Sequence, residues 1–135
     1  DRWVSRGAGA QFTVYRLPMT EAQRDAVVKG ALAYLGAGYD IYFSSQNKTI
    51  YCSELVALAF AKAGLQLGQY QKVRTLNVKG DKVQALLRKR GPSHPACQGK
   101  KVSLDQCLEL IFDTDLIPPA SVAHDTKLQQ VYPKR

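Results

Sequence analysis

Long hydrophobic runs are missing from this 135-residue chain. No apolar stretch approaches the roughly 18 residues that a membrane-spanning helix needs. Internal repeats and low-complexity tracts are also missing, which excludes a collagen-like fibre and a disordered chain. Hydrophobic residues nevertheless make up 45% of the sequence, enough to form a core. We therefore expect one globular domain over residues 1–135.

The chain begins Asp1-Arg2-Trp3, without Met and without the basic and then apolar pattern of a signal peptide. We therefore expect it to be the C-terminal portion of a longer polypeptide. Acidic residues are few, since 11 Asp and Glu stand against 19 Lys and Arg, for a net charge of +8. Such a surface prefers anionic partners, among them nucleic acid, acidic lipid and anionic cell-wall polymer.

Cysteine is scarce, and its count of three is odd. The economical interpretation pairs Cys97 with Cys107, because Cys97 stands among Pro, Gly and Lys residues where burial of a thiol is unexpected. Cys52 is then a free thiol. The alternative is that all three are reduced and buried as small hydrophobic residues.

Periodicity predicts one clear strand and several helices. In the strand, residues 11–17, Phe12, Val14 and Leu17 alternate with polar neighbours until Pro18 ends it. Helices are predicted over residues 20–35, 53–63, 81–90 and 103–112, and residues 127–132 form a last turn or a strand.

Two of these helices begin with a capping-box pattern, Thr20 with Gln23 and Ser103 with Gln106. In the first of them, Val28, Leu32 and Leu35 fall at helical spacing and predict its buried face, and Gly36 and Gly38 end it. The helix over residues 53–63 is apolar nearly all round, which predicts the buried central helix. Residues 91–101 are expected to form a loop rich in Pro, Gly and Lys.

The most specific signal is the segment Tyr51-Cys52-Ser53-Glu54-Leu55-Val56. It places a cysteine at a strand-to-helix junction, on the first turn of the apolar helix. Unpaired backbone N–H groups and the helix dipole stabilise a thiolate there, and the same N–H groups can face a developing oxyanion. The alternative is an inert cysteine packed under the helix.

This segment resembles the nucleophile motif of circularly permuted papain-like thiol hydrolases. They form the YiiX/YebB-like branch of the NlpC-type cell-wall peptidase superfamily, distantly akin to lecithin–retinol acyltransferases. Gly38-Tyr39-Asp40 with Phe43 is similar to the Gly-x-Tyr-Asp segment before their nucleophile, and residues 3–17 and 117–132 resemble their flanking segments. The likeness is strongest over residues 12–65 and loose over residues 66–112.

The resemblance implies a papain-like α+β domain, with Cys52 at the N-terminus of a central buried helix packed on an antiparallel sheet. Cys52 would attack the carbonyl of an amide or ester and form an acyl-enzyme. Peptide amides of the cell envelope and lipid-linked acyl groups are the candidate substrates, with no cofactor. A periplasmic, secreted or envelope location would follow.

The histidine base of that family lies on strands upstream of its cysteine, whereas residues 1–51 of this chain contain no histidine. Either an upstream segment of the same protein, or a second chain, supplies the histidine, or the chain is an inactive relative. We expect an open face beside Cys52, or another segment filling it. His94 and His124 are weak candidates, because both lie in turn-like sequence typical of solvated histidines.

Five further residues are candidates for site support, each with a plainer alternative. Tyr39 can donate a hydrogen bond to an oxyanion or be a core aromatic residue. Asp40 can orient a polar partner or make a turn, and Glu54 can bias the site or be a first-turn carboxylate stabilised by the helix dipole. Tyr51 and Ser53 flank the nucleophile directly.

Two rival interpretations remain. His94, Cys97, Cys107 and His124 could form a zinc site, but only the first two have suitable spacing, and we expect no metal. Residues 79–101 hold seven Lys and Arg and one Asp, a net charge of +6, without the aromatic or glycine-rich patterns of a nucleic-acid module. The alternative to an enzyme is therefore a catalytically inactive or non-enzymatic basic module that binds an anionic partner.

Overall fold

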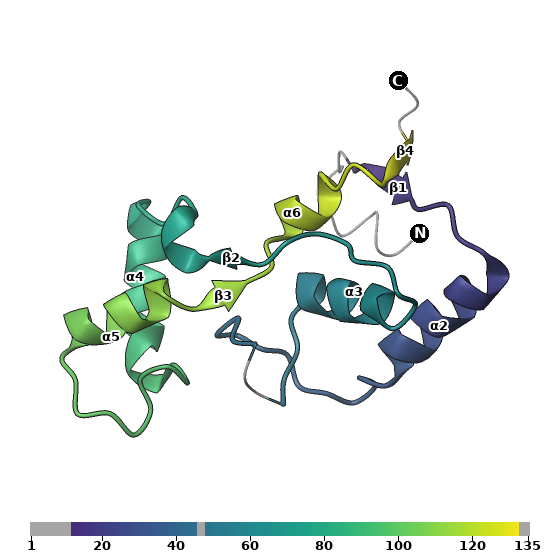
Figure 1. Ribbon diagram of the computed structural model, residues 1–135. Helices are drawn as coiled ribbons and strands as arrows, with labels where there is room; N and C mark the ends of the chain where they lie inside the picture. The colour runs from purple at the N-terminus through teal and green to yellow at the C-terminus, as the bar shows by residue number, and fades with distance from the viewer. Residues whose placement is uncertain (1–11, 46–47, 133–135) are drawn as a thin grey trace.

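The computed structural model describes residues 12–45 and 48–132. Along the chain it contains β1 (Val14–Arg16), α2 (Glu21–Leu32), α3 (Cys52–Ala61), β2 (Gln71–Lys72), α4 (Asp81–Arg90), α5 (Leu104–Phe112), β3 (Asp115–Leu116), α6 (Pro119–Ala123) and β4 (Gln129–Tyr132) (Figure 1). Short 3-10 turns follow β2 and α4, at Val73–Thr75 and Gly91–Ser93. None of the helices in the described part of the chain has the length and hydrophobicity that crossing a membrane requires.

The strands form two small antiparallel sheets, β1 with β4 and β2 with β3. Residues 127–132 thus supply a strand. The strand predicted over residues 11–17 is shorter, and Gln11 lies outside the described residues. The prediction that Val14 faces inward is wrong, because Val14 is exposed and its neighbour Tyr15 is half-buried instead. The pairing with β4 shifts register between these two residues, which breaks the expected alternation.

Helix α2 begins as predicted, because Thr20 and Gln23 form a reciprocal capping box. Its predicted buried face is wrong, since Val28, Leu32 and Leu35 are 57%, 58% and 86% exposed. The helix instead approaches α3 through Gly30, where a Cβ atom would stand 3.0 Å from the carbonyl oxygen of Ala59. This close approach turns the helix so that its aliphatic residues face solvent.

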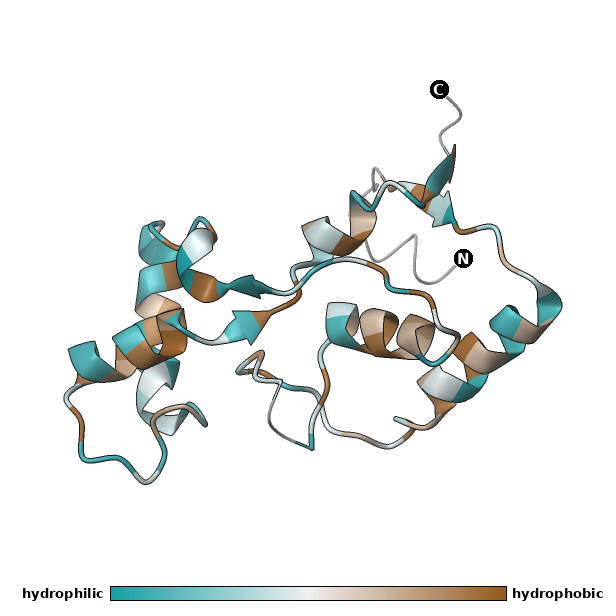
Figure 2. Ribbon diagram, in the orientation of Figure 1, coloured by the Kyte–Doolittle hydropathy of each residue, from teal (hydrophilic) through white to brown (hydrophobic). Residues whose placement is uncertain are grey.

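Helix α3 lies centrally, between α2 and α6, and carries the most hydrophobic helical sequence (Figures 1 and 2). Its start at Cys52 is one residue before the predicted boundary, and its end at Ala61 is two residues before the predicted one. Four of its residues are buried: Ser53, Glu54, Ala57 and Ala59. Leu55, Val56, Leu58 and Phe60 remain only half-buried, so the neighbours described here do not enclose the helix completely.

Helices α4 and α5 form a separate lobe, joined to the rest by the β2–β3 ribbon (Figure 1). The bounds of α4 match the predicted residues 81–90, and Ser103 with Gln106 caps α5 as predicted. Cys97 and Cys107 form a disulfide with a Cα–Cα distance of 5.5 Å, and both pack with Leu108 and Ile111. The disulfide fastens the loop after α4 to α5.

Candidate active site

Cys52 is the first residue of α3, and its side chain is exposed with a free thiol. Tyr51 has extended backbone dihedrals as the N-cap and gives the helix no side-chain cap, so it does not occupy the first N–H groups of α3. Tyr51, Ser53 and Glu54 are 1%, 5% and 5% exposed, so the residues around Cys52 point inward. The local sequence therefore presents the cysteine alone to solvent.

Tyr51 and Ser53 hold the chain after β3 against the start of α3. The hydroxyl of Ser53 donates to the carbonyl oxygen of Ile117 over 2.7 Å, and the backbone N–H of Ile117 donates to the Tyr51 hydroxyl oxygen over 3.0 Å. Burial raises the pKa of Tyr51 to about 12, which keeps its phenol neutral. These two side chains support the site by fixing the helix terminus.

Glu54 accepts a hydrogen bond from the backbone N–H of Tyr51, the reciprocal half of a capping box. Its other carboxylate oxygen, Oε2, is buried and has no hydrogen-bond partner within the described chain. Burial raises the pKa of Glu54, and the charge of Asp40 adds to this effect. The residue is thus a buried carboxylate beneath the helix start.

Tyr39 lies beside the nucleophile candidate. Gly38 and Asp40 exchange backbone hydrogen bonds with Ile50 over 3.0 and 3.1 Å, which places Tyr39 next to the approach to α3. Its side chain is exposed, and its hydroxyl lies close enough to Cys52 for the two groups to interact electrostatically. Desolvation and the proximity of Cys52 raise the pKa of Tyr39, so the phenol stays protonated near neutrality and can donate to an anion.

Asp40 is 1% exposed and builds the turn that follows Tyr39. Its Oδ1 and Oδ2 atoms accept from the backbone N–H groups of Tyr42 and Ser44 over 2.8 and 2.6 Å. The turn holds Phe43 at a φ of 55°, where its ring packs edge-on against Tyr51 with 5.4 Å between centroids. Of the two predicted roles, Asp40 adopts that of a turn residue.

A groove of about 400 Å³ opens at Cys52. Its other walls come from β1, α3, α6 and the segment before β4: Tyr15, Leu17, Ser53, Val56, Phe60, Leu67, Pro119, Val122, Ala123 and Leu128. Most of these side chains are apolar, so the exposed thiol is one of the few polar groups that line the groove. The arrangement suits attack by sulfur on a carbonyl whose substituent is apolar.

Comparison with known proteins places this site in a family. The model of a family described as permuted papain-like amidase enzymes, YaeF/YiiX, the C92 family, matches residues 1–132. The chain belongs to this C92 family. It therefore has the permuted papain-like fold, here an α+β arrangement with small antiparallel sheets, and its family is one of amidases.

Two relatives agree with this assignment. The uncharacterized protein YiiX of Escherichia coli K12 is 28% identical over 118 residues, which cover 83% of this chain and 55% of that protein. The crystal structure of the metalloprotein yiiX from Escherichia coli O157:H7 superposes with a TM-score of 0.77 at 26% identity. That match covers 96% of this chain and 66% of the other. The chain thus spans about half the length of the curated relative.

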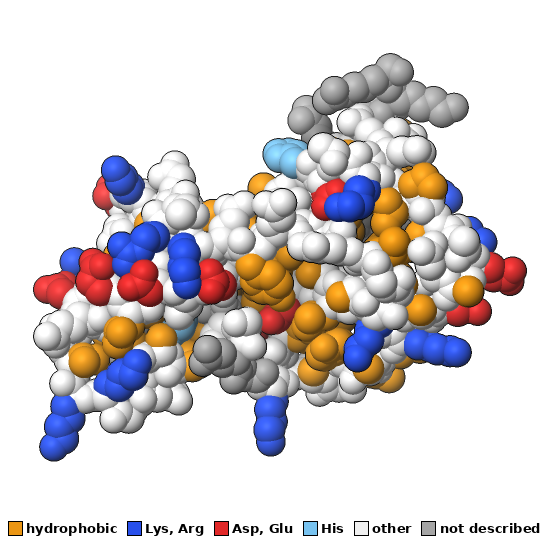
Figure 3. Space-filling model, in the orientation of Figure 1, with side chains coloured by type: hydrophobic (Ala, Val, Ile, Leu, Met, Phe, Trp, Pro, Cys, Tyr) orange, Lys and Arg blue, Asp and Glu red, His pale blue; other side chains and the backbone are white. Residues whose placement is uncertain are grey.

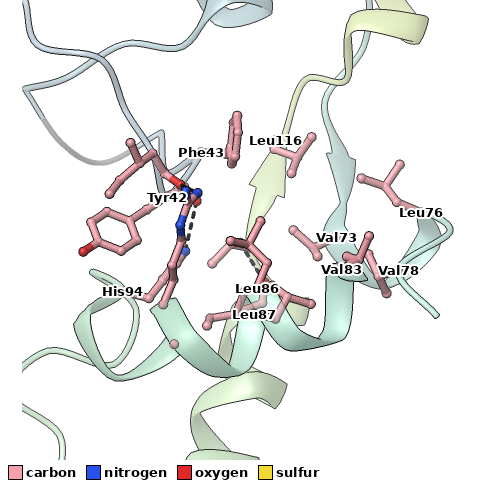
Figure 4. A pocket seen from close by; sticks show the side chains of 15 residues that line it. Tyr42, Phe43, Val73, Leu76, Val78, Val83, Leu86, Leu87, His94 and Leu116 are labelled. Carbon is pink, nitrogen blue, oxygen red and sulfur yellow. Dashed lines mark hydrogen bonds between the residues drawn. The ribbon is translucent and has the colours of Figure 1, made fainter. Parts of the chain in front are cut away.

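His94 is 4% exposed, so the prediction of a solvated turn histidine is wrong for it. Its Nδ1 accepts from the backbone N–H of Ala96 over 3.1 Å, which leaves Nε2 to donate to the carbonyl oxygen of Tyr42 over 3.2 Å (Figure 4). Burial lowers the pKa of His94 and keeps the ring neutral. In this C92 protein His94 links the α4–α5 lobe to the turn after Asp40.

His124 is exposed at the C-terminal end of α6, beside a polar surface hollow that Gln69 and Asp125 also line. Neither histidine shares a hydrogen bond with Cys52, so the structure does not bring a base to the nucleophile candidate from these two residues. The rival interpretation of a zinc site formed with Cys97 and Cys107 is wrong, because the sulfurs of these two cysteines are bonded to each other and cannot act as thiolate ligands.

The yiiX protein of Escherichia coli O157:H7 is described as a metalloprotein. In this C92 protein, residues 12–45 and 48–132 contain no group of three or more His, Cys, Asp or Glu side chains able to hold a metal ion. The described residues therefore do not fit a metal centre of their own.

Sequence reasoning missed the groove. Tyr15, Val56 and Leu128 come from distant segments, and each is locally typical of an ordinary strand or helix core. The local signal is the abundance of apolar residues around α3, which by itself indicates burial rather than a binding surface. The groove arises because α3 is left partly uncovered on the side of Cys52.

Proposed function

We propose that this C92 protein is a thiol hydrolase in which Cys52 attacks the carbonyl carbon of an amide or ester. The proposal is carried by the exposed thiol at the first residue of α3, which lines an apolar groove. The backbone N–H groups of the first helical turn stabilise the thiolate and then the oxyanion of the tetrahedral intermediate. Tyr39, whose hydroxyl lies beside Cys52, is the second oxyanion donor.

The proposed reaction proceeds in two steps. The thiolate forms a C–S bond, the carbonyl π electrons move to oxygen, and collapse of the intermediate breaks the C–N or C–O bond to the leaving group. An amine leaving group takes a proton from a general acid. Water, which loses a proton to the base, then attacks the thioester carbonyl, the C–S bond breaks, and a carboxylic acid and the Cys52 thiolate are released. Because His94 is buried against Tyr42 and the exposed His124 lines a different hollow, beside Gln69 and Asp125, we assign the acid and base to a histidine from an upstream segment or a second chain.

The groove favours a substrate with an apolar acyl group, and among envelope components this means lipid-linked acyl groups before peptide amides of peptidoglycan. Its walls at Val56, Phe60 and Val122 offer aliphatic and aromatic contacts. A peptidoglycan stem peptide would require more polar partners than these side chains provide. The corresponding location is the periplasm or the cell surface, where such acyl groups occur.

Activated esters separate the action of the nucleophile from that of the base. A p-nitrophenolate leaving group needs no proton, so p-nitrophenyl octanoate should acylate Cys52 in this chain, and the Cys52→Ala variant should release no burst of p-nitrophenolate. Fatty-acyl anilides should be hydrolysed only by the protein that includes its upstream segment. If Cys52 of that longer protein were acylated but the protein hydrolysed no amide, the non-enzymatic alternative would be favoured.

The groove itself is tested by Val56→Phe, which fills it, with Leu58→Phe on the other open face of α3 as the matched control. The preference for octanoyl over acetyl p-nitrophenyl ester should fall roughly tenfold in Val56→Phe and remain in Leu58→Phe. An equal loss in both variants would contradict the assignment of the acyl group to the groove.

A further inference from the structure

The apolar face of α4 is incompletely covered. Val83, Leu86 and Leu87 lie on one face of the helix at spacings of three and four residues, yet no residue of α4 is buried. Val83 and Leu86 are 38% and 41% exposed, and they line an apolar cavity of about 170 Å³ toward which Phe43 and Leu116 also project (Figure 4). Aliphatic surface of the helix is therefore open to solvent.

Unpaired cations lie along α4 and near its two ends. Lys82 and Lys89 lie one turn before and after Leu86 on α4, and Lys79 precedes the helix. Lys100 and Lys101 adjoin the exposed Val102 and Leu104, and a Cβ atom at Gly91, the C-cap of α4, would stand 3.4 Å from Leu104 Cδ1. The ion pairs found in the described part of the chain include none of these five lysines.

Asp81 is the first residue of α4; the other acidic residues of the same lobe lie at α5 and β3, and each of these has a cationic partner. Asp105 pairs with Arg88, Asp115 with Lys72, and Glu109 and Asp113 with Arg74, at distances of 2.7–3.6 Å. Figure 3 shows acidic and basic side chains intermixed across one face of the lobe, with hydrophobic side chains and further Lys and Arg beside them. Charge is thus neutralised at α5 and left positive around α4.

From this arrangement we propose that α4 docks the protein on an anionic lipid bilayer. The five lysines contact lipid phosphates, and Val83 and Leu86 enter the boundary between headgroups and acyl chains. A bilayer uses both features, whereas an anionic wall polymer or a nucleic acid would use the cations and leave the aliphatic side chains in water. This docking does not depend on the chemistry proposed for Cys52.

Co-sedimentation with vesicles tests the proposal on the whole protein. The wild type should bind vesicles of equal parts phosphatidylglycerol and phosphatidylcholine, should bind vesicles of phosphatidylcholine alone much more weakly, and should dissociate as salt is raised. The double variant Lys82→Gln/Lys89→Gln should partition on the order of twentyfold less. Leu86→Ala should partition several-fold less at unchanged charge.

The matched control is Arg24→Gln/Lys29→Gln, which removes the same charge from exposed positions on α2. It should bind the anionic vesicles within about twofold of the wild type. All variants should keep the circular dichroism spectrum of the wild type. Equal losses in the two double variants, equal binding to both vesicle types, or tighter binding to duplex DNA than to the anionic vesicles would overturn the proposal.

Discussion

Only one of the two carboxylate oxygens of Glu54 has a hydrogen-bond partner in the described chain. One oxygen accepts the N–H of Tyr51, and the other, Oε2, is buried with no hydrogen-bond partner in the described chain. A buried group of this kind disfavours its own ionisation. Because its pKa is raised in the folded state, the folded protein holds this proton more tightly than the unfolded chain does.

This linkage predicts a specific pH dependence at Glu54. The contribution of Glu54 to stability is fully present below the unfolded pKa of about 4.3 and is lost as the pH rises through the raised folded pKa. Glu54→Gln should abolish that loss, so the free energy of unfolding, measured with urea across this range, should depend less on pH.

Glu109→Gln is the control, because that exposed carboxylate lies on α5 beside Arg74. It should change stability by no more than about 0.5 kcal/mol. If the wild type and Glu54→Gln lost stability in parallel as the pH rises, the buried carboxylate would not be the source of the dependence.

The nucleophile candidate could be proposed from sequence because its signal is local. A cysteine on the first turn of an apolar helix is visible in residues 51–56 alone. His94 shows the limit, because its flanking Pro, Ser and Gly residues are typical of a surface turn. Its burial comes from contacts with Tyr42 and from the lobe that the disulfide fastens, which are distant in sequence.

At the scale of elements, the peptide of Ile117 joins β3 to α3. Both of its backbone groups bond to side chains that flank Cys52, and all three residues are buried. Loss of either side-chain partner leaves a buried peptide group unpaired, which costs about 1–3 kcal/mol.

Ser53→Ala is therefore expected to lower the free energy of unfolding by about 1–3 kcal/mol, as measured by urea denaturation. Ser121→Ala is the control, because the Ser121 hydroxyl donates to the carbonyl oxygen of Gln69 over 3.1 Å and accepts from the Gln69 N–H over 2.7 Å, both at an exposed site. Loss of the Ser121 hydroxyl should lower the free energy of unfolding by about 0.5 kcal/mol. Equal destabilisation by the two substitutions would show that the bond to Ile117 has no special weight.

Helix boundaries followed from the sequence better than helix faces did. Capping boxes at Thr20 and Ser103 are local hydrogen-bond patterns, and both helices begin there. The face of α2 depends on its partner, and Gly30 lets the backbone of α3 approach more closely than any aliphatic side chain would. The aliphatic positions of α2 consequently face outward, against the expectation from periodicity.

At the scale of the whole molecule, the chain combines two parts with different roles. One part holds α3, the groove and Cys52, and the other is the α4–α5 lobe (Figure 1), whose five lysines take part in none of the ion pairs found in the described residues. The permuted papain-like fold could be predicted from the segment around Cys52. The helices of the lobe could be predicted from the sequence, but its position relative to α3 could not. That position depends on the β2–β3 ribbon and on the hydrogen bond between His94 and Tyr42, which join segments far apart in the sequence.

The most direct test of the central claim is to trap the acyl-enzyme. The native protein, unreduced, is mixed with p-nitrophenyl octanoate, quenched in acid and digested, and the modified peptide is located by mass spectrometry. An octanoyl thioester on Cys52 is expected, with Cys97 and Cys107 recovered as a disulfide-linked pair. An acyl group on any other residue, or release of p-nitrophenolate at the same rate by the Cys52→Ala variant, would contradict the assignment of Cys52 as the nucleophile.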